Sequence, residues 1–384
     1  MPWKDSSVFR QRMDLVQAML AGVAPVVAIC RRFGITRSTA YKFLARFRAD
    51  GRKGLRDRSH APRQAHARQA PRWRERVLRL RRVHPSWGAR KLGWLLRRRF
   101  RGPGRPAERT VQRWIKQAGL VRRFRPLRRR VRPSRRRRPT VARRSNDVWT
   151  IDLKGWFRTR DGTKIEPLTV RDLWSRFVLW TKPLAPKDDA NVRRICRYLF
   201  RQYGTPRVIR CDRGAPFFGV GPHGFTRLSL WWWRLGIRVE FVRRGSINNN
   251  AHEQMHGVMV AELQIVRTAR GQARGLLRWT RSYNYERPHE AIGLRTPASV
   301  YRPRPRSRPA LRPPRYPHDW LVRIVEANGE IALPGWRGSI GRAFGGLPVG
   351  LAPAGHRRYR VYFASLYLGR LDLDRTRKLI WPVF

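Results

Sequence analysis

Acidic residues are scarce in this chain. Of its 384 residues only 24 are aspartate or glutamate, against 87 lysines and arginines, and the formal net charge is +63. A compact protein with so much self-repulsion is built to meet a polyanion. The charge balance therefore predicts a nucleic-acid partner.

Long apolar runs and paired cysteines are also missing. No apolar run reaches the roughly eighteen residues of a membrane-spanning helix, and the first residues contain no signal-peptide core. The three cysteines, Cys30, Cys196 and Cys211, match neither a disulfide framework nor a zinc spacing. We therefore expect no membrane association and a reducing cytoplasmic location, associated with a bacterial nucleoid.

Apolar and aromatic residues, in contrast, are plentiful. The chain is 41% hydrophobic, with 16 Trp, 10 Tyr and 16 Phe. This content excludes a wholly disordered polybasic tail. The length is sufficient for roughly two or three domains, so at least one sizeable core is expected.

Residues 1–60 are predicted to form a helical, basic domain. Helices are expected over 8–20 and 25–33, and Thr36 can cap a third helix that ends near residue 48. Helix, Gly-containing turn and capped helix is the pattern of a helix-turn-helix, although an ordinary three-helix packing unit has the same pattern. On the third helix Tyr41, Leu44 and Ala45 are expected to face inward. Its candidate DNA contacts are Arg37, Ser38, Thr39 and Lys42.

A second helix-turn-helix domain is predicted over residues 72–120. Trp73, Val77 and Leu80 recur at helical spacing before a turn at 85–88. Further helices are expected over 89–100 and 109–119.

An arginine-rich stretch follows over residues 121–145. Between Val121 and Arg144, 13 of 24 residues are arginine, interleaved with prolines. Such a run is a solvated linker in the free protein. On DNA it would neutralise phosphates, and Arg135, Arg136, Arg137 and Arg138 are its strongest candidate contacts.

Residues 146–300 have a different pattern. Three strand-like segments are followed by helix, strand, helix, strand and a long helix that begins near residue 250. This order predicts an α/β core with a mixed five-stranded sheet. After a Pro/Arg linker, short alternating strands expected over 321–325, 331–333, 358–364 and 366–371 predict a small C-terminal β-barrel over residues 318–384. The fold class is therefore multidomain, with all-α, α/β and all-β parts.

Three carboxylates of the α/β core have unusual settings. Asp152 lies inside the first strand, Asp212 ends the fourth, and Glu253 lies in the first turns of the long helix. Neighbouring strands and a crossing helix can bring three acids to one end of a sheet, where hard oxygen ligands bind Mg²⁺ or Mn²⁺. The alternative is that these acids only cap helices and pair with arginines.

The sequence around these acids resembles a known family. VWTIDLKGWF, IRCDRGAPF and NNNAHEQMH contain the three acids, with 59 and 40 residues between them, and PLTVRDLWSRFVL, LSLWWWRLGI and YNYERPHEAIG lie in the same order. Together they resemble insertion-sequence transposases of the DDE type, which have a retroviral-integrase core. The resemblance implies an RNase H-like fold with catalytic and metal-ligating Asp152, Asp212 and Glu253. It also implies two Mg²⁺ ions, for which Mn²⁺ would substitute.

The chain departs from that family at a few positions after Glu253. Gln254 stands where a basic residue is frequent, and Gly257 and Val260 offer no cation one turn further on. Arg243, Arg244 and Arg267 are the candidate replacements for contacting DNA. His252 and His256 are expected to pack the helix or face DNA, and Trp231 to Trp233 to lie in a core or a subunit contact.

The expected function is that of a transposase. It would bind the terminal inverted repeats of its mobile element, cleave a strand and transfer it to target DNA, as a homo-oligomer assembled on double-stranded DNA. The alternatives are a domesticated, catalytically silent DNA-binding regulator and a structure-specific nuclease. A ribosome-like RNA-binding protein would match the charge but not the three acids.

Overall fold

A computed structural model describes most of the chain, in several stretches. These are residues 8–57, 71–100, 104–121, 139–153, 155–242, 250–303, 311, 313–376 and 378–380. Arg135 to Arg138, Arg243 and Arg244 lie outside the described residues, so the predictions made for them stay predictions. No described helix is both long enough and apolar enough to cross a membrane.

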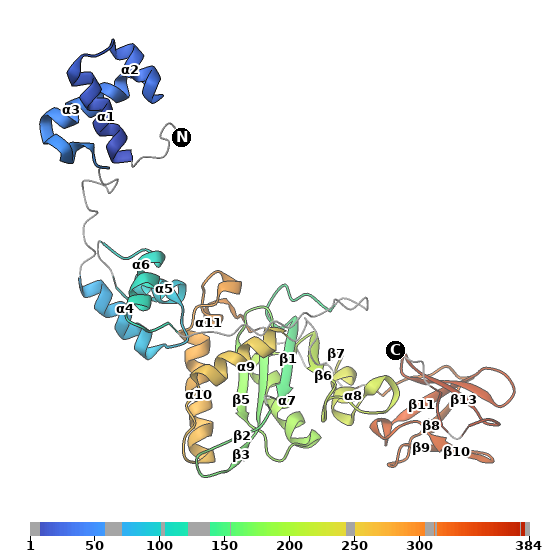
Figure 1. The fold of residues 1–384 in the computed structure, drawn as a ribbon. Coiled ribbons are helices and arrows are strands. Elements are labelled where there is room, and N and C mark those ends of the chain that lie inside the picture. The colour runs from blue at the N-terminus through green and yellow to red at the C-terminus, as the bar shows by residue number, and fades with distance from the viewer. Residues whose placement is uncertain are drawn as a thin grey trace. The chain divides into compact units, whose positions relative to one another are not determined.

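The N-terminal unit consists of three helices around a small apolar core (Figure 1): α1 (Val8–Ala21), α2 (Val26–Phe33) and α3 (Arg37–Asp50). The Thr36 side chain accepts a hydrogen bond from the Thr39 amide at 3.3 Å, which confirms the predicted cap. Gly34, at φ +64°, ends α2 in the left-handed region that favours glycine.

The inward face of α3 differs from the prediction. Ala40, Phe43 and Leu44 are buried, whereas Tyr41 is 48% exposed and Ala45 is exposed as well. The predicted face was wrong at these two positions because the buried side chains follow the spacing i, i+3, i+4 from Ala40 rather than from Tyr41.

A second set of three helices precedes the sheet: α4 (Pro71–Val83), α5 (Ala89–Arg99) and α6 (Glu108–Gln117). Their shared core contains Trp73, Val77 and Leu80, as the helical spacing predicted. The buried Arg81 donates to the backbone carbonyls of Trp87 and Leu120, which ties the end of α4 to the turn before α5 and to the segment after α6.

The central sheet has five strands in the order β5-β4-β1-β6-β7. β1 runs antiparallel to β4 and parallel to β6, and β6 runs parallel to β7, so the predicted mixed sheet is confirmed. The strands are β1 (Val148–Leu153), β4 (Pro167–Asp172), β5 (Val178–Pro183), β6 (Val208–Asp212) and β7 (Arg238–Val242). A separate short hairpin consists of β2 (Phe157–Arg158) and β3 (Lys164–Ile165).

Helices cover both faces of this sheet (Figure 1). α7 (Asp189–Tyr203) and α8 (Arg227–Arg234) pack on the apolar face, where Trp231 and Trp232 are buried in the main core. The other face is met by α9 (Asn250–Glu262) and α10 (Ala269–Tyr285), whose apolar side chains gather around Val178 of β5. Strand side chains alternate between the two faces. Thr150 of β1 and Thr169 of β4 lie on the face that meets α9, where both hydroxyls are within hydrogen-bond distance of His252.

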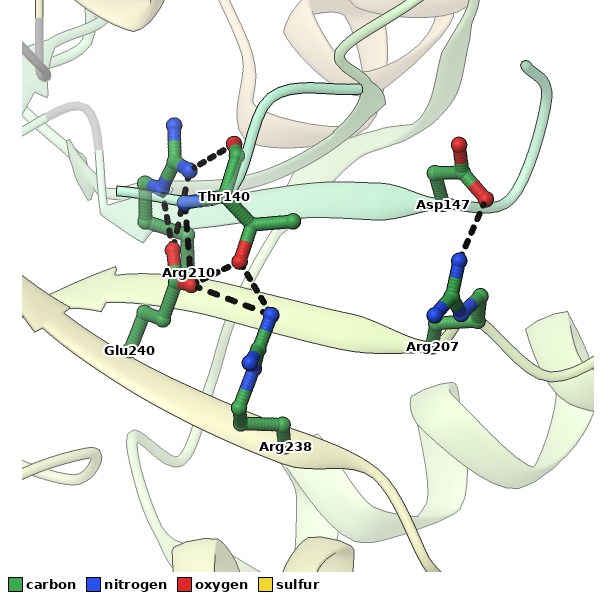
Figure 2. A network of polar contacts seen from close by, with 6 residues as sticks. All are labelled: Thr140, Asp147, Arg207, Arg210, Arg238 and Glu240. Carbon is green, nitrogen blue, oxygen red and sulfur yellow. Dashed lines mark hydrogen bonds and ion pairs between the residues drawn. The ribbon is translucent and has the colours of Figure 1, made fainter. Parts of the chain in front are cut away.

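The last strand of the sheet is tied to Thr140, near the end of the arginine-rich stretch (Figure 2). Glu240 accepts hydrogen bonds from the backbone and hydroxyl of Thr140 and forms an ion pair with Arg210 at 2.8 Å. Arg210 also donates to the Thr140 carbonyl at 2.7 Å, and Arg238 donates to the Thr140 hydroxyl. Burial raises the pKa of Glu240, but the hydrogen bond from Thr140 and the charge of Arg210 outweigh it and lower the pKa overall.

The second helical set contacts the last turn of α9. Glu262 accepts from the Ser86 hydroxyl, from the indole nitrogen of Trp87 at 3.2 Å and from that of Trp279 at 3.1 Å. Arg287 forms an ion pair with the same carboxylate. One partly buried acid therefore joins α4–α6 to the sheet domain.

The C-terminal part contains two antiparallel sheets that share one core, not a closed barrel. The larger has the order β13-β12-β11-β8 and the smaller pairs β10 with β9. The predicted β structure is confirmed, but the described strands do not close on themselves. The strands are β8 (Leu321–Ile324), β9 (Glu330–Leu333), β10 (Trp336–Ser339), β11 (Pro348–Pro353), β12 (Arg358–Phe363) and β13 (Leu366–Asp372).

Candidate active site

Two of the three predicted acids lie on adjacent parallel strands at the same level. Thr150 of β1 is in register with Arg210 of β6, so Asp152 and Asp212, two residues further along each strand, lie at the same height. Both point away from the apolar face that contains Ile151 and Cys211. Burial raises the pKa of the Cys211 thiol well above its usual value, and the nearby charges of Asp212 and Asp152 raise it further. Both carboxylates therefore lie close enough to the Cys211 thiol to act on it electrostatically.

The sequence after Asp212 leaves room for its carboxylate. The Gly214 amide donates to Asp212 Oδ1 at 3.2 Å, and a Cβ at Gly214 would lie 3.2 Å from both carboxylate oxygens. A side chain at that position would press on the carboxylate, so glycine permits a close approach of the backbone. Both Asp152 and Asp212 remain partly exposed.

The third acid, Glu253, lies in the first turn of α9 and is exposed. Neither Glu253 nor Asp212 belongs to the cluster of metal-ligand atoms found among the described residues. That cluster consists of Asp152, His252 and His256, whose ligand atoms all lie within 4.8 Å of one another. Glu253 thus lies on the helix whose histidines reach Asp152, but its own side chain is not part of that cluster.

The two histidines of α9 are buried against the sheet. His252 Nδ1 lies 2.8 Å from the Thr150 hydroxyl, and its Nε2 lies 2.6 Å from the Thr169 hydroxyl. Burial lowers the pKa of His252 well below its usual value, and the charges of His256 and Arg171 lower it further, so the ring is neutral. His256 Nε2 lies 2.9 Å from Thr169, and its Nδ1 lies 3.8 Å from Asp152 Oδ2. Both histidines therefore pack α9 against the sheet, which is one of the two roles expected for them.

Other acids of the domain have structural surroundings. Asp172 is fully buried and accepts from the Asn146 and Ser175 amides, both at 2.8 Å. Asp188 caps α7 by accepting from the Asn191 amide at 2.8 Å. Both therefore hold turns or helix ends.

The donors at this edge match a hard divalent cation. Carboxylate oxygens of Asp152 and Asp212 are partly exposed side by side, which is the ligand type that Mg²⁺ and Mn²⁺ prefer. A histidine nitrogen beside Asp152 is a softer donor that suits Mn²⁺ better than Mg²⁺. Sequence reasoning named His256 but did not expect it beside Asp152, because that proximity depends on how α9 lies on the sheet.

The predicted DNA contacts of the first helical unit lie at the start of α3. Arg37, Ser38 and Lys42 are exposed, and Thr39 is partly exposed. The Thr36 hydroxyl lies within hydrogen-bond distance of the Ser38 and Thr39 hydroxyls, at 3.0 and 2.9 Å. Two cations and two hydroxyls thus lie within the first two turns of α3.

Relatives of known sequence and structure give weak overall matches. A protein of Burkholderia multivorans, described as the insertion element IS407 uncharacterized 31.7 kDa protein, is 25% identical over 194 residues, which is 50% of this chain and 67% of that protein. The HTLV-2 integrase catalytic core domain, solved in complex with magnesium, matches 42% of this chain and all of its own at 12% identity and a TM-score of 0.34. The simian T-cell lymphotropic virus intasome matches 80% of this chain at 11% identity, with 99% of its own chain covered and a TM-score of 0.36.

Family models match three parts of the chain. Residues 11–63 match a helix-turn-helix domain, and residues 39–115 match a homeodomain-like domain. Residues 321–379 match the C-terminal domain of the IS481 family of transposases. The chain is thus similar to helix-turn-helix domains in its N-terminal part and to IS481-family transposases in its C-terminal part.

Proposed function

We propose that this chain is a transposase, which binds the terminal inverted repeats of its mobile element and catalyses metal-dependent DNA strand cleavage and strand transfer. The observation that carries the proposal is the level placement of Asp152 and Asp212 on neighbouring parallel strands. The helix that crosses that face contains Glu253 in its first turn. These are the three acids that the motif resemblance singles out.

In this proposal Asp152, Asp212 and Glu253 are the catalytic residues and hold two Mg²⁺ ions, with Mn²⁺ as a substitute. Two such ions, when bound, activate an attacking oxygen and stabilise the leaving oxygen at phosphorus. The Gly214 amide orients the Asp212 carboxylate. Glu253 would turn toward the aspartates when the ions bind, because an exposed glutamate at a helix start changes rotamer easily.

The reaction consists of two displacements at phosphorus. Water attacks at the end of the element and releases a 3′-hydroxyl. That hydroxyl then attacks a phosphodiester of the target DNA, so that a new P–O bond joins the element to the target while the target's own P–O bond breaks and its 3′-oxygen leaves. Both steps use the same acids. In each step the oxygen nucleophile attacks phosphorus directly, so no covalent enzyme intermediate is required.

Double-stranded DNA is the proposed partner of the basic surfaces. Arg37, Ser38, Thr39 and Lys42 would read the terminal repeats, since the start of a recognition helix contacts base edges. The cations of the Arg135–Arg138 run, with Arg243 and Arg244, would neutralise phosphates. Joining two ends of one element requires at least two copies of the chain, so a homo-oligomer assembled on DNA is expected.

A catalytically silent regulator is the alternative from another class. Such a protein would need the helix-turn-helix units but not two partly exposed aspartates at one level of the sheet. A plain nuclease would cleave the end without joining it to a target. Strand-transfer products distinguish a transposase from both.

Isosteric substitution of the acids tests the proposal. Asp152→Asn, Asp212→Asn and Glu253→Gln each remove one anionic ligand with almost no change in volume. Cleavage and strand transfer should fall together by about 10³-fold or more, while binding to terminal DNA in a gel shift should persist. The measurement uses intact and pre-nicked ends with Mg²⁺ and then Mn²⁺.

The matched control is Asp188→Asn, in the same domain. Asparagine caps a helix as well as aspartate does, so this variant should fold and act normally. Asp172 is unsuitable because its buried carboxylate holds the turn at Ser175. Near-normal activity in a triad variant would remove that residue from the site.

A further inference from the structure

Thr169 lies at the centre of a hydrogen-bonded group that joins β1, β4 and α9. Its side chain is fully buried, and Asp152 is its cross-strand partner in the sheet. The Thr169 hydroxyl donates to the backbone carbonyl of Asp152 at 3.0 Å. The same oxygen lies 2.6 Å from His252 Nε2 and 2.9 Å from His256 Nε2.

The protons of this group can be assigned by counting donors. A hydroxyl has one proton and two lone pairs. Because the Thr169 proton goes to the Asp152 carbonyl, both lone pairs accept, and each histidine donates through its Nε2. His252 Nδ1 is then the acceptor for the Thr150 hydroxyl at 2.8 Å, a shorter contact than the 3.4 Å from that hydroxyl to the Arg171 carbonyl. One hydroxyl therefore orients two imidazole rings and one main-chain carbonyl.

The three partners of Thr169 all bear on the proposed active site. One is the backbone of Asp152 itself, and the second, His252, directly precedes Glu253 in the chain. The third, His256, presents its other ring nitrogen to Asp152 Oδ2 at 3.8 Å. The hydroxyl thus connects the strand of the first acid to the helix of the third.

The fold by itself does not require this hydroxyl. A buried position in a central strand favours a β-branched side chain, and valine has the same shape as threonine. A buried hydroxyl is costly without partners, and here it has three. The benefit of the Thr169 hydroxyl must therefore lie in positioning the Asp152 carbonyl and the two imidazole rings.

We propose that Thr169 is a positioning residue for the metal-dependent reaction, acting through Asp152 and through the histidines that seat the helix of Glu253. The inference rests on the proposed function and adds a residue that does not touch metal or DNA. Metal ligands must be held to within about 0.5 Å. Loss of a residue that orients a ligand typically costs about 10- to 100-fold in metal affinity.

Two substitutions at this position separate positioning from packing. Thr169→Val keeps the volume and loses the hydroxyl, whereas Thr169→Ser keeps the hydroxyl and loses a methyl group. If Thr169 positions the acids, Val should weaken Mn²⁺ binding by about 10- to 100-fold, and Ser should stay within about threefold of the wild type. If Thr169 only packs, the Val variant should keep the Mn²⁺ affinity of the wild type. The Ser variant should then be the more affected of the two, because Ser leaves a small cavity and Val does not.

The measurement is a Mn²⁺ titration of the full chain, followed by the relaxation rate of water protons, so it needs no turnover. Thermal unfolding of each variant is recorded beside it. Wild-type Mn²⁺ affinity in Thr169→Val would overturn the inference. If that variant does not fold, His252→Leu removes the same hydrogen bond from the side of α9. Unchanged Mn²⁺ affinity in His252→Leu would overturn the inference equally.

Asp152→Asn in the same titration keeps the two proposals apart. If Asp152→Asn loses Mn²⁺ and Thr169→Val does not, the proposed metal site stands and the role of Thr169 is wrong. If Asp152→Asn binds Mn²⁺ like the wild type, the proposed function loses its metal site.

Discussion

The two ends of α9 each carry a glutamate, and their surroundings are opposite. Glu253, in the first turn, is exposed. Glu262, at the last position, has a side chain only 17% exposed and accepts from Ser86, Trp87, Trp279 and Arg287. In a chain with 87 cations, an acid that serves the fold is surrounded by donors. An acid that stays exposed, as Glu253 does, is the one that the proposed function makes available to an incoming cation.

Removing the negative charge at one end of α9 or at the other should give opposite phenotypes. Glu253→Gln should abolish cleavage, by about 10³-fold or more, with little change in the free energy of unfolding. Glu262→Gln should lower that free energy by about 3 kcal/mol, because the buried guanidinium of Arg287 loses its counter-charge. Urea denaturation and single-turnover cleavage, measured on both variants, check the contrast. A stable Glu262→Gln protein would refute the structural role of that acid.

The region around Glu262 should also respond to acid. Burial, then the charges of Arg287 and Lys91, lower the pKa of His289 to about 3. The unfolded chain binds that proton near pH 6.5, so the stabilisation is complete above pH 6.5 and is lost as the pH falls toward 3. Between pH 7 and 5 the wild type should lose about 1–2 kcal/mol more than His289→Gln. The exposed His318→Gln is the control, and identical pH profiles for all three proteins would contradict the prediction.

The smallest effect concerns a single donor to Glu262. Ser86→Ala removes one of four hydrogen-bond donors and should cost about 1 kcal/mol of stability. The matched control is Ser282→Ala, whose hydroxyl bonds Glu286 at an exposed site. That change should cost less than about 0.5 kcal/mol. Equal melting temperatures for the two variants would mean that Ser86 contributes nothing to the contact.

Much of the fold was predictable because its cause is local. The spacing of Trp73, Val77 and Leu80 predicted α4, and the cap at Thr36 predicted the start of α3. The inward face of α3 was predicted wrongly, since an alanine–phenylalanine–leucine face and a tyrosine–leucine–alanine face both have helical spacing. The choice between them depends on what α1 and α2 present to α3.

The C-terminal region shows the same limit for strands. Alternation predicted β8, β9, β12 and β13 but missed β10 and β11, which contain several glycines and prolines. Barrel closure was not predictable either, because it depends on strand tilt and stagger and not on the pattern of one strand.

The sequence by itself determined the net charge, the order of helices and strands, and which acids stand at strand ends and helix starts. Only the tertiary structure decided that Thr169 reaches both histidines of α9, more than 80 residues away, and that Glu262 meets Ser86 across 176 residues. The reason is physical. Periodicity and capping act between near neighbours in the chain, whereas a side-chain hydrogen bond at long range depends on strand register and on the angle at which a helix crosses the sheet.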